Sequence, residues 1–154
     1  AGFAPAQYRL AKAFENGDGV EQDLARAREL TERAALAGNC RAMHDAGVFL
    51  ARGEGIAMDE TAAARWFRAA AERGVADSQY NLALLHQQGR GVSQSSVDAL
   101  YWYLVAARSH DVNAVERAVE VAALLTPEQV QEARTRARAF RARPSDPHAN
   151  GVFE

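Results

Sequence analysis

The chain has 154 residues, of which 48% are hydrophobic and 25% charged, and its formal net charge is -2. This length suits one domain with a sizeable core, and the near balance of acids and bases produces no long-range field that would attract nucleic acid. No apolar run approaches the roughly 18 residues that a membrane-spanning helix needs. We therefore expect a globular chain that neither binds nucleic acid nor inserts into a membrane.

A glycine-rich stretch recurs three times along the chain at a fixed spacing. It reads NGDGVEQD from Asn16, RGEGIAMD from Arg52 and QGRGVSQS from Gln88, which places the first glycines of successive copies 36 residues apart. Alanine pairs recur in the same register at Ala34-Ala35, Ala70-Ala71 and Ala106-Ala107. A fixed period of this kind is the sequence signature of a repeat array, so we predict three full repeats.

Each repeat predicts two helices joined by the glycine stretch. In the first copy, Ala6, Leu10, Ala11 and Phe14 stand at helical spacing and indicate a helix from about Pro5 to Glu15. The glycine that follows each first helix suits a left-handed C-cap, and these glycines are Gly17, Gly53 and Gly89. Short polar residues suit the N-caps of the second helices, and these are Asp23, Asp59 and Ser95.

Apolar residues inside and after the glycine stretches are predicted to pack onto the core. Val20, Ile56 and Val92 occupy the same place in each stretch and are expected to hold the loop against the helices. Trp66 and Trp102 align with each other and are expected to be largely buried between repeats.

A ligand-binding role for the glycine stretches is the alternative to a structural one. A phosphate-binding loop occurs once, follows a strand and carries a lysine, whereas these stretches occur three times between helices without one. A calcium loop needs oxygen ligands at fixed positions, yet Asp18 is replaced by Glu54 and then by Arg90. The pattern favours turns.

These features resemble the Sel1-like repeats, which are solenoid relatives of tetratricopeptide repeats with a longer, glycine-punctuated turn. The resemblance covers about residues 1 to 125 and rests on AQYRLAKAFENGDGVEQD, AAARWFRAAAERG and QYNLALLHQQGRGV. The chain departs from the pattern at Leu30, Ser95 and His110, which replace a tryptophan, an aspartate and the closing glycine. The resemblance implies an all-α, right-handed α-solenoid that acts as a non-catalytic protein-interaction scaffold without a cofactor.

The two ends of the chain differ from the repeats. AGFAPA at the start aligns with AGNCRA at Ala37, so we expect an earlier repeat upstream. Ala114 to Leu125 replaces the first helix of a fourth copy, and Thr126 with Gln129 forms a capping box for a terminal helix. That helix carries one apolar stripe, formed by Val130, Ala133, Ala137 and Phe140. We predict a repeat domain over residues 1-142, comprising three full repeats, a partial repeat and a capping helix, and an extended tail over residues 143-154.

Reactive and charged residues give two readings each. The capping helix has arginines outside its apolar stripe, at Arg134, Arg136, Arg138 and Arg141, which either bind an anionic glycan or a partner, or form a solvated face partly paired with Glu128 and Glu132. Cys40 aligns with Ala4 and Ala76, which favours a packed thiol over a nucleophile. The four histidines share no metal-ligand spacing, so no metal site is predicted.

Tetratricopeptide geometry, applied by analogy, places a binding groove on the first helices. It predicts a ladder of Tyr8, His44 and Tyr80, continued by Glu116, and a second region of Lys12, Arg52, Gln87 and Gln88. Aromatic and polar side chains that recur in register suit an extended peptide or a glycan. The alternative is that the tyrosines are core positions that pack between repeats.

A narrower resemblance concerns the end of the array. Three repeats followed by an L-T-P-E-Q helix, with DSQYNLALLHQQGRGV in the last copy, resemble the periplasmic repeat part of the PodJ-type polar localisation factors of alphaproteobacteria. This implies a periplasmic module of a bacterial polar organising protein that binds protein partners or peptidoglycan. A glycan-binding envelope module is the alternative function.

Overall fold

The computed structural model describes residues 3–109 and 112–151, so His110 and Gly2 lie outside the described residues. Within these ranges the chain forms eight α-helices and two short 3-10 helices and has no strand. The helices are α1 (Ala4–Asn16), α2 (Leu24–Leu36), α3 (Cys40–Arg52), α4 (Glu60–Ala71), α5 (Ala76–Gln88), α6 (Ser96–Ala106), α7 (Val112–Ala122) and α8 (Pro127–Ala139), and the 3-10 helices are η1 (Ala107–Ser109) and η2 (His148–Asn150).

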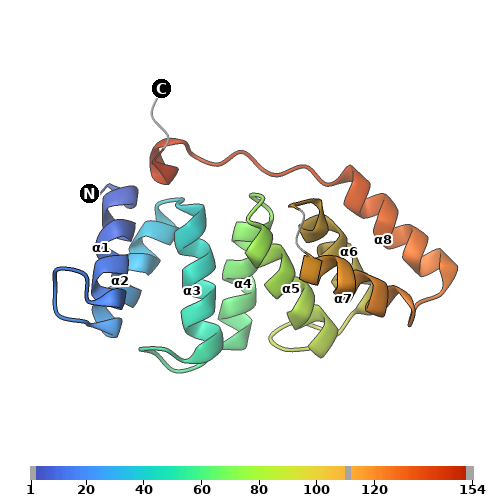
Figure 1. The fold of residues 1–154 in the computed structure, drawn as a ribbon, viewed down its shortest axis with the longest axis horizontal. Helices are drawn as coiled ribbons and strands as arrows, with labels where there is room; N and C mark the ends of the chain where they lie inside the picture. Colours follow the sequence, from blue (N-terminus) through green and yellow to red (C-terminus); the bar gives the residue numbers. More distant parts are fainter. Residues whose placement is uncertain (1–2, 110–111, 152–154) are drawn as a thin grey trace.

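The helices stand in a row in which each packs against the next from α1 to α7 (Figure 1). Three helix pairs, α1 with α2, α3 with α4 and α5 with α6, form the three repeats, and α7 takes the place of a fourth first helix. The capping helix α8 packs mainly against α6. The structure confirms the predicted all-α solenoid.

The glycine stretches are the turns between paired helices, as predicted. Gly17, Gly53 and Gly89 end the first helices with φ values of 76°, 71° and 67°. The side chains of the predicted N-caps accept hydrogen bonds from the first turns, from Arg26 N to Asp23, from Ala62 N to Asp59 and from Asp98 N to Ser95. The amides of the same three caps donate to the preceding helices, at Phe14 O, Leu50 O and His86 O. Each loop is therefore closed by contacts within the chain.

The second glycine of each loop brings successive repeats into backbone contact. A Cβ at Gly91 would overlap the carbonyl oxygen of Glu60, the first residue of α4. A Cβ at Gly55 would lie 3.1 Å from the carbonyl oxygen of Leu24, the first residue of α2. Gly19, in the first repeat, has nothing within 4 Å of the same point. The loop of each later repeat thus rests on the start of the second helix before it.

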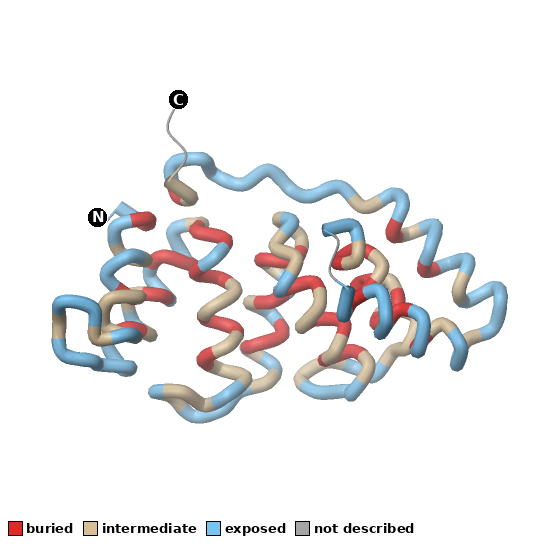
Figure 2. The backbone as a smooth tube through the Cα atoms, viewed as in Figure 1, coloured by how far each residue is buried: buried red, intermediate tan, exposed pale blue. Residues whose placement is uncertain are grey.

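The core is built largely of alanine, and its buried positions lie where neighbouring helices face each other (Figure 2). Ala34, Ala70 and Ala106, which are equivalent in the three repeats, each have 0% of their surface exposed. Larger side chains fill the third repeat, where Leu82 and Tyr103 are also fully buried. Small side chains allow close helix contacts, as the alanine register predicted.

Three predicted core positions are more exposed than expected. Ala6 and Leu10 are exposed on α1, although their counterparts in α3 and α5 are buried. In α3 and α5 this face packs against the second helix of the preceding repeat, and α1 has no such helix within the described residues. Trp66 is only half-buried and lines a shallow cavity with Arg28 and Glu32. Trp102 is 4% exposed because Phe140 packs against it, with 5.9 Å between ring centroids.

The end of the chain folds back along the array. Helix α8 has the predicted capping box between Thr126 and Gln129. The segment after it has no regular structure up to Asp146 and crosses the repeats toward α1 (Figure 1). Arg143 N donates to Glu72 O (2.7 Å) and Asn39 Nδ2 donates to Ala149 O (2.8 Å). The tail predicted to be extended over residues 143–154 is irregular only up to Asp146, because the 3-10 helix η2 follows, and residues 152–154 lie outside the described ranges. The sequence carried no signal for the docking of this segment.

Replacing Gly91 by alanine is predicted to destabilise the fold far more than replacing Gly19. Both glycines have positive φ, which costs a residue with a Cβ about 1 kcal/mol. Gly91→Ala additionally drives a Cβ into the Glu60 carbonyl, so the repeats must separate. Urea denaturation of the two variants measures the difference. Equal losses of unfolding free energy would show that the loop does not set the contact between repeats.

Trp102→Ala is expected to lower the free energy of unfolding by about 3 to 5 kcal/mol, the usual cost of truncating a buried aromatic residue. Trp66→Ala serves as the matched comparison and should lower the free energy of unfolding clearly less, because the Trp66 side chain is only half-buried. Thermal and urea denaturation report both values. A larger loss for Trp66 would contradict the burial assigned to the two rings.

Candidate functional site

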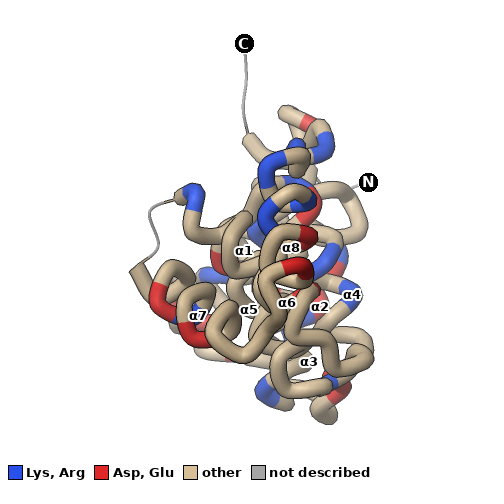
Figure 3. The backbone as a smooth tube through the Cα atoms, turned by 90° about the vertical axis from the view of Figure 1, so that its right-hand side faces the viewer, with Lys and Arg blue, Asp and Glu red and all other residues tan. Residues whose placement is uncertain are grey.

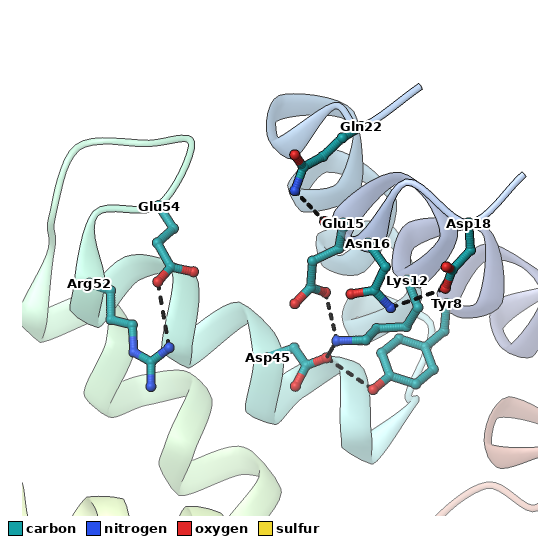
Figure 4. Close-up of polar contacts among 9 residues, drawn as sticks. All are labelled: Tyr8, Lys12, Glu15, Asn16, Asp18, Gln22, Asp45, Arg52 and Glu54. Carbon is teal, nitrogen blue, oxygen red and sulfur yellow. Dashed lines mark hydrogen bonds and ion pairs between the residues drawn. The ribbon is translucent and has the colours of Figure 1, made fainter. Parts of the chain in front are cut away.

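The first part of the predicted ladder lies between α1 and α3, where Asp45 joins two repeats (Figure 4). The Tyr8 hydroxyl donates to Asp45 Oδ2 at 2.9 Å. Lys12 Nζ lies 3.4 Å from the same oxygen and 2.6 Å from Glu15 Oε2. One carboxylate therefore receives a hydrogen bond from each of two predicted site residues.

The protonation states in this cluster follow from burial and from the neighbouring acids. Burial raises the pKa of Tyr8, and the nearby Asp45 charge raises it further, so the hydroxyl stays a hydrogen-bond donor. Partial burial lowers the pKa of Lys12, but the hydrogen bond to Glu15 and the charge of Asp45 outweigh it and the net shift is upward. Both groups are held in the form that pairs with carboxylate.

His44 joins α3 to α5 in a comparable way. Its Nδ1 lies 2.8 Å from Ser78 Oγ, and its ring lies 5.7 Å from the Phe67 ring. Burial lowers the pKa of His44, which favours the neutral imidazole. A serine next to a histidine also occurs in nucleophilic catalysis, but Ser78 has 0% of its surface exposed. A substrate carbon cannot reach this hydroxyl, so the contact is structural.

Tyr80 stands at the next position of the ladder and lies at the junction of α5, α6 and α7. Its ring meets that of Tyr103 in a T-shaped contact of 5.4 Å. The Tyr103 hydroxyl donates to Gln87 Oε1 at 2.8 Å, and burial raises the pKa of Tyr103 to about 12. Glu116, the predicted continuation on α7, is exposed, and the α7 side chain that interacts with Tyr80 is that of Arg117, whose pKa this interaction raises.

The contacts of the two tyrosines share an offset that the repeat pattern did not reveal, whereas His44 contacts Ser78, two residues before its own counterpart. Tyr8 reaches Asp45 and Tyr80 reaches Arg117, so each tyrosine contacts the residue just after its own counterpart in the next repeat. A signal for this was present, because that column is polar in every copy: Arg9, Asp45, Asn81 and Arg117. The aligned polar residues that follow each ladder position could therefore have predicted the contact partners of the tyrosines.

A cavity of about 490 Å³ brings part of the predicted site together. We call it the first-helix cavity, and the side chains that line it are Tyr8, Arg41, His44, Asp45, Val75 and Asp77. Tyr8 and His44 are half-buried at its wall, whereas Arg41 and Asp77 are exposed. Neither rim residue makes an ion pair within the part of the chain that the structure describes.

Apart from Lys12, which pairs with the lining residue Asp45, the second predicted region lies away from this cavity. Arg52 and Gln88 are exposed at the ends of α3 and α5 and contact their own loops, Arg52 through Glu54 at 3.5 Å and Gln88 through Arg90 at 3.3 Å. Gln87 is half-buried and accepts the hydrogen bond from Tyr103. The structure therefore brings Tyr8, Lys12 and His44 close to one cluster and leaves Arg52, Gln88 and Glu116 on other surfaces.

The structure also locates the groups that could serve as a cysteine nucleophile, a metal site or a membrane span. Cys40 is buried, and burial raises the pKa of its thiol. Within residues 3–109 and 112–151, no three histidine, cysteine, aspartate or glutamate side chains are grouped to hold a metal ion. In the same ranges, no helix has the length and apolar character required to cross a bilayer.

The arginines of the capping helix divide into two groups. In the end-on view of Figure 3, basic positions follow one another along α8 and the segment after it. Arg134 and Arg138 are exposed to solvent. Arg136 pairs with Asp98 at 2.7 Å and with Glu132 at 3.6 Å, and its guanidinium lies 4.5 Å from the centre of the Tyr101 ring. Arg136 and Arg141 line a second cavity, between α8 and α6.

Comparisons with known proteins agree with this architecture. The sequence profile of the Sel1 repeat matches residues 4–39, 40–75 and 76–111. A Sel1 repeat protein from Oxalobacter formigenes has a similar crystal structure, with a TM-score of 0.72 and 34% identity over 76% of this chain and 88% of that one. No curated protein sequence matches the chain significantly.

A protective antigen of uropathogenic Escherichia coli strains, which displays an SLR fold, has a TM-score of 0.74 at 24% identity. The match covers 89% of this chain but only 37% of that antigen, and at this identity it shows the shared fold. Three consecutive profile matches in the register of the helix pairs, together with the Oxalobacter relative, show that the chain belongs to the Sel1 repeat family.

Proposed function

We propose that this chain is a non-catalytic protein-interaction scaffold whose partner binds over the first-helix cavity. Sel1 repeat proteins generally serve as protein-interaction scaffolds. The observation that carries the proposal is that different residues of the cavity hold the repeats together and face the solvent. Tyr8 and His44 tie neighbouring repeats together at its wall, while the exposed charges of Arg41 and Asp77 stand at its rim.

This arrangement suits an extended segment of a protein partner. A wall held by contacts between repeats is rigid, so a partner loses little binding free energy in ordering it. The rim offers one cation and one anion from successive first helices, which match the mixed charges of a polypeptide. An open cavity of about 490 Å³ accepts one or two side chains and leaves the partner's backbone outside.

Photo-cross-linking from the rim tests the binding surface. A photoreactive residue at position 41 or 77 is expected to cross-link the same protein partner in cells, whereas one at position 65, which is exposed on α4, is not. The double variant Arg41→Ala with Asp77→Ala should then weaken binding of the identified partner by about tenfold or more, as for central interface residues. Its melting temperature should fall by no more than about 3 °C, because neither side chain makes an ion pair and Asp77 contributes only a first-turn charge to α5. Equal cross-linking from position 65 would place the partner elsewhere.

We further propose that the scaffold works in the bacterial cell envelope, as a periplasmic module of a polar organising protein. The support is the resemblance to PodJ-type factors in the last repeat and in the L-T-P-E-Q start of the capping helix. Peptidoglycan binding is the alternative function. The observation that favours it is the Arg136 guanidinium stacked over the Tyr101 ring. Aromatic rings can stack on sugars and guanidinium groups can pair with the carboxylates that such sugars carry.

Co-sedimentation with purified peptidoglycan sacculi separates the two functions. A protein scaffold is expected to stay in the supernatant at low and high salt. Retention of the protein in the pellet at high salt would favour the glycan function, since screened charges alone do not hold a protein there. Bovine serum albumin in the same tube controls for trapping.

A further inference from the structure

A second cavity, of about 570 Å³, lies where α8 and the start of the C-terminal segment meet α4 and α6. We call it the arginine cavity. Its charged lining comprises Arg68, Glu72, Asp98, Arg136, Arg141 and Arg143. The aromatic residues Tyr101, Trp102 and Phe140 also line it. Four arginines therefore line one cavity together with three aromatic residues.

All four arginines are held by separate anchors, Arg141 through hydrogen bonds from Nη1 to the carbonyl oxygens of Arg138 (2.9 Å) and Phe140 (2.8 Å). Arg136 is fixed by Asp98 at 2.7 Å and by the Tyr101 ring. Arg143 pairs with Glu72 at 3.2 Å. Arg68 Nη2 lies 3.3 Å from His86 Nε2. Side chains held in this way lose little conformational freedom when a ligand binds.

His86 is the least expected member of this arrangement. The same position holds Phe14 and Leu50 in the first two repeats, yet His86 is only 7% exposed. Its Nδ1 lies 3.3 Å from the carbonyl oxygen of Ser93, and burial lowers its pKa. A neutral ring that donates from Nδ1 to this oxygen accepts from Arg68 at Nε2. A polar residue at an apolar repeat position thus positions a cavity arginine.

The cavity carries an excess of positive charge. Its two carboxylates, Glu72 and Asp98, are already engaged by Arg143 and Arg136. Arg68 and Arg141 make no ion pair with any carboxylate in the described residues, and both are exposed. Since the whole chain is slightly acidic, this excess is local. Planar guanidinium groups pair in a bidentate way with carboxylates.

We infer that the arginine cavity binds an acidic peptide segment, with carboxylates paired to Arg68 and Arg141. The side-chain carboxylates of Asp98 and Glu72 already pair with arginines of this cavity. An acidic side chain of a partner would pair with the remaining arginines in the same way. The assignment to a protein partner rests on the proposed scaffold function, whereas the preference for an anion rests on the cavity itself.

Fluorescence anisotropy with a labelled hexaglutamate peptide tests this inference, with the matched hexaglutamine peptide as the neutral control. The double variant Arg68→Ala with Arg141→Ala should weaken hexaglutamate binding about tenfold or more, since each charge-assisted pair lost contributes a large factor. The control variant, Arg134→Ala with Arg138→Ala, removes the same charge from exposed positions of α8 outside the cavity. It should retain most of the affinity.

The variant His86→Leu restores the residue type of the second repeat and tests the positioning of Arg68. The melting temperature should be maintained or raised, because leucine suits a buried repeat position, while hexaglutamate affinity falls. A loss of both would indicate that His86 serves the fold alone. This readout separates positioning from stability.

Three outcomes would overturn the inference. The first is that hexaglutamate does not bind, the second is that the two double variants lower its affinity equally, and the third is that an oligomer of glucuronic acid binds while hexaglutamate does not. The last result would assign the cavity to acidic glycans. None of them bears on cross-linking from positions 41 and 77, so a failure here is distinguishable from a failure of the proposed first-helix surface.

Discussion

The contact on which the rest of the array depends is the one between a glycine loop and the first residue of the second helix before it. A Cβ at Gly91 would overlap the Glu60 carbonyl, and a Cβ at Gly55 would lie 3.1 Å from the Leu24 carbonyl oxygen, which is tighter than an ordinary contact. Arg90 adds a side-chain tie to Glu60, with Nε donating to Oε1 at 2.6 Å. Because helices are stiff, a backbone contact at one end sets the separation of repeats along their whole length.

That separation determines which side chains of neighbouring first helices meet. Helices packed this closely let Tyr8 reach Asp45 and let His44 reach Ser78, and both contacts border the first-helix cavity. The residues that bind neighbouring repeats are therefore also the wall of the candidate binding surface. Side chains free to contact a partner are those at the rim, such as Arg41 and Asp77, which the packing leaves exposed. Stability and binding are thereby assigned to different residues of one surface.

The sequence predicted local structure well because each signal acts over a few residues. Gly17, Gly53 and Gly89 end helices, and Thr126 with Gln129 starts one, through hydrogen bonds to nearby backbone. Contacts that depend on how whole helices are set against each other were not predicted. The burial difference between Trp66 and Trp102 depends on Phe140 at the end of α8, and the interaction of Tyr80 with Arg117 depends on how α7 is set against α5. The sequence pattern of a single repeat predicts neither the burial of the two tryptophans nor the partner of Tyr80.

The repeat pattern ends after the third repeat, and there α7 and α8 pack differently from the helix pairs before them. Val115 and Val119 on α7 are 47% and 68% exposed, although their counterparts in α3 and α5 are buried. In those repeats the second helix covers this face, as Phe67 covers Gly47, whereas α8 packs against α6. In that position α8 covers Trp102 and brings Arg136 to Asp98. Ala133 and Ala137 of α8 are buried in the same apolar cluster as Trp102, so apolar burial stabilises this position of the helix even though two valines of α7 stay exposed. The same placement of α8 therefore closes the apolar core of the last repeat and forms one wall of the arginine cavity.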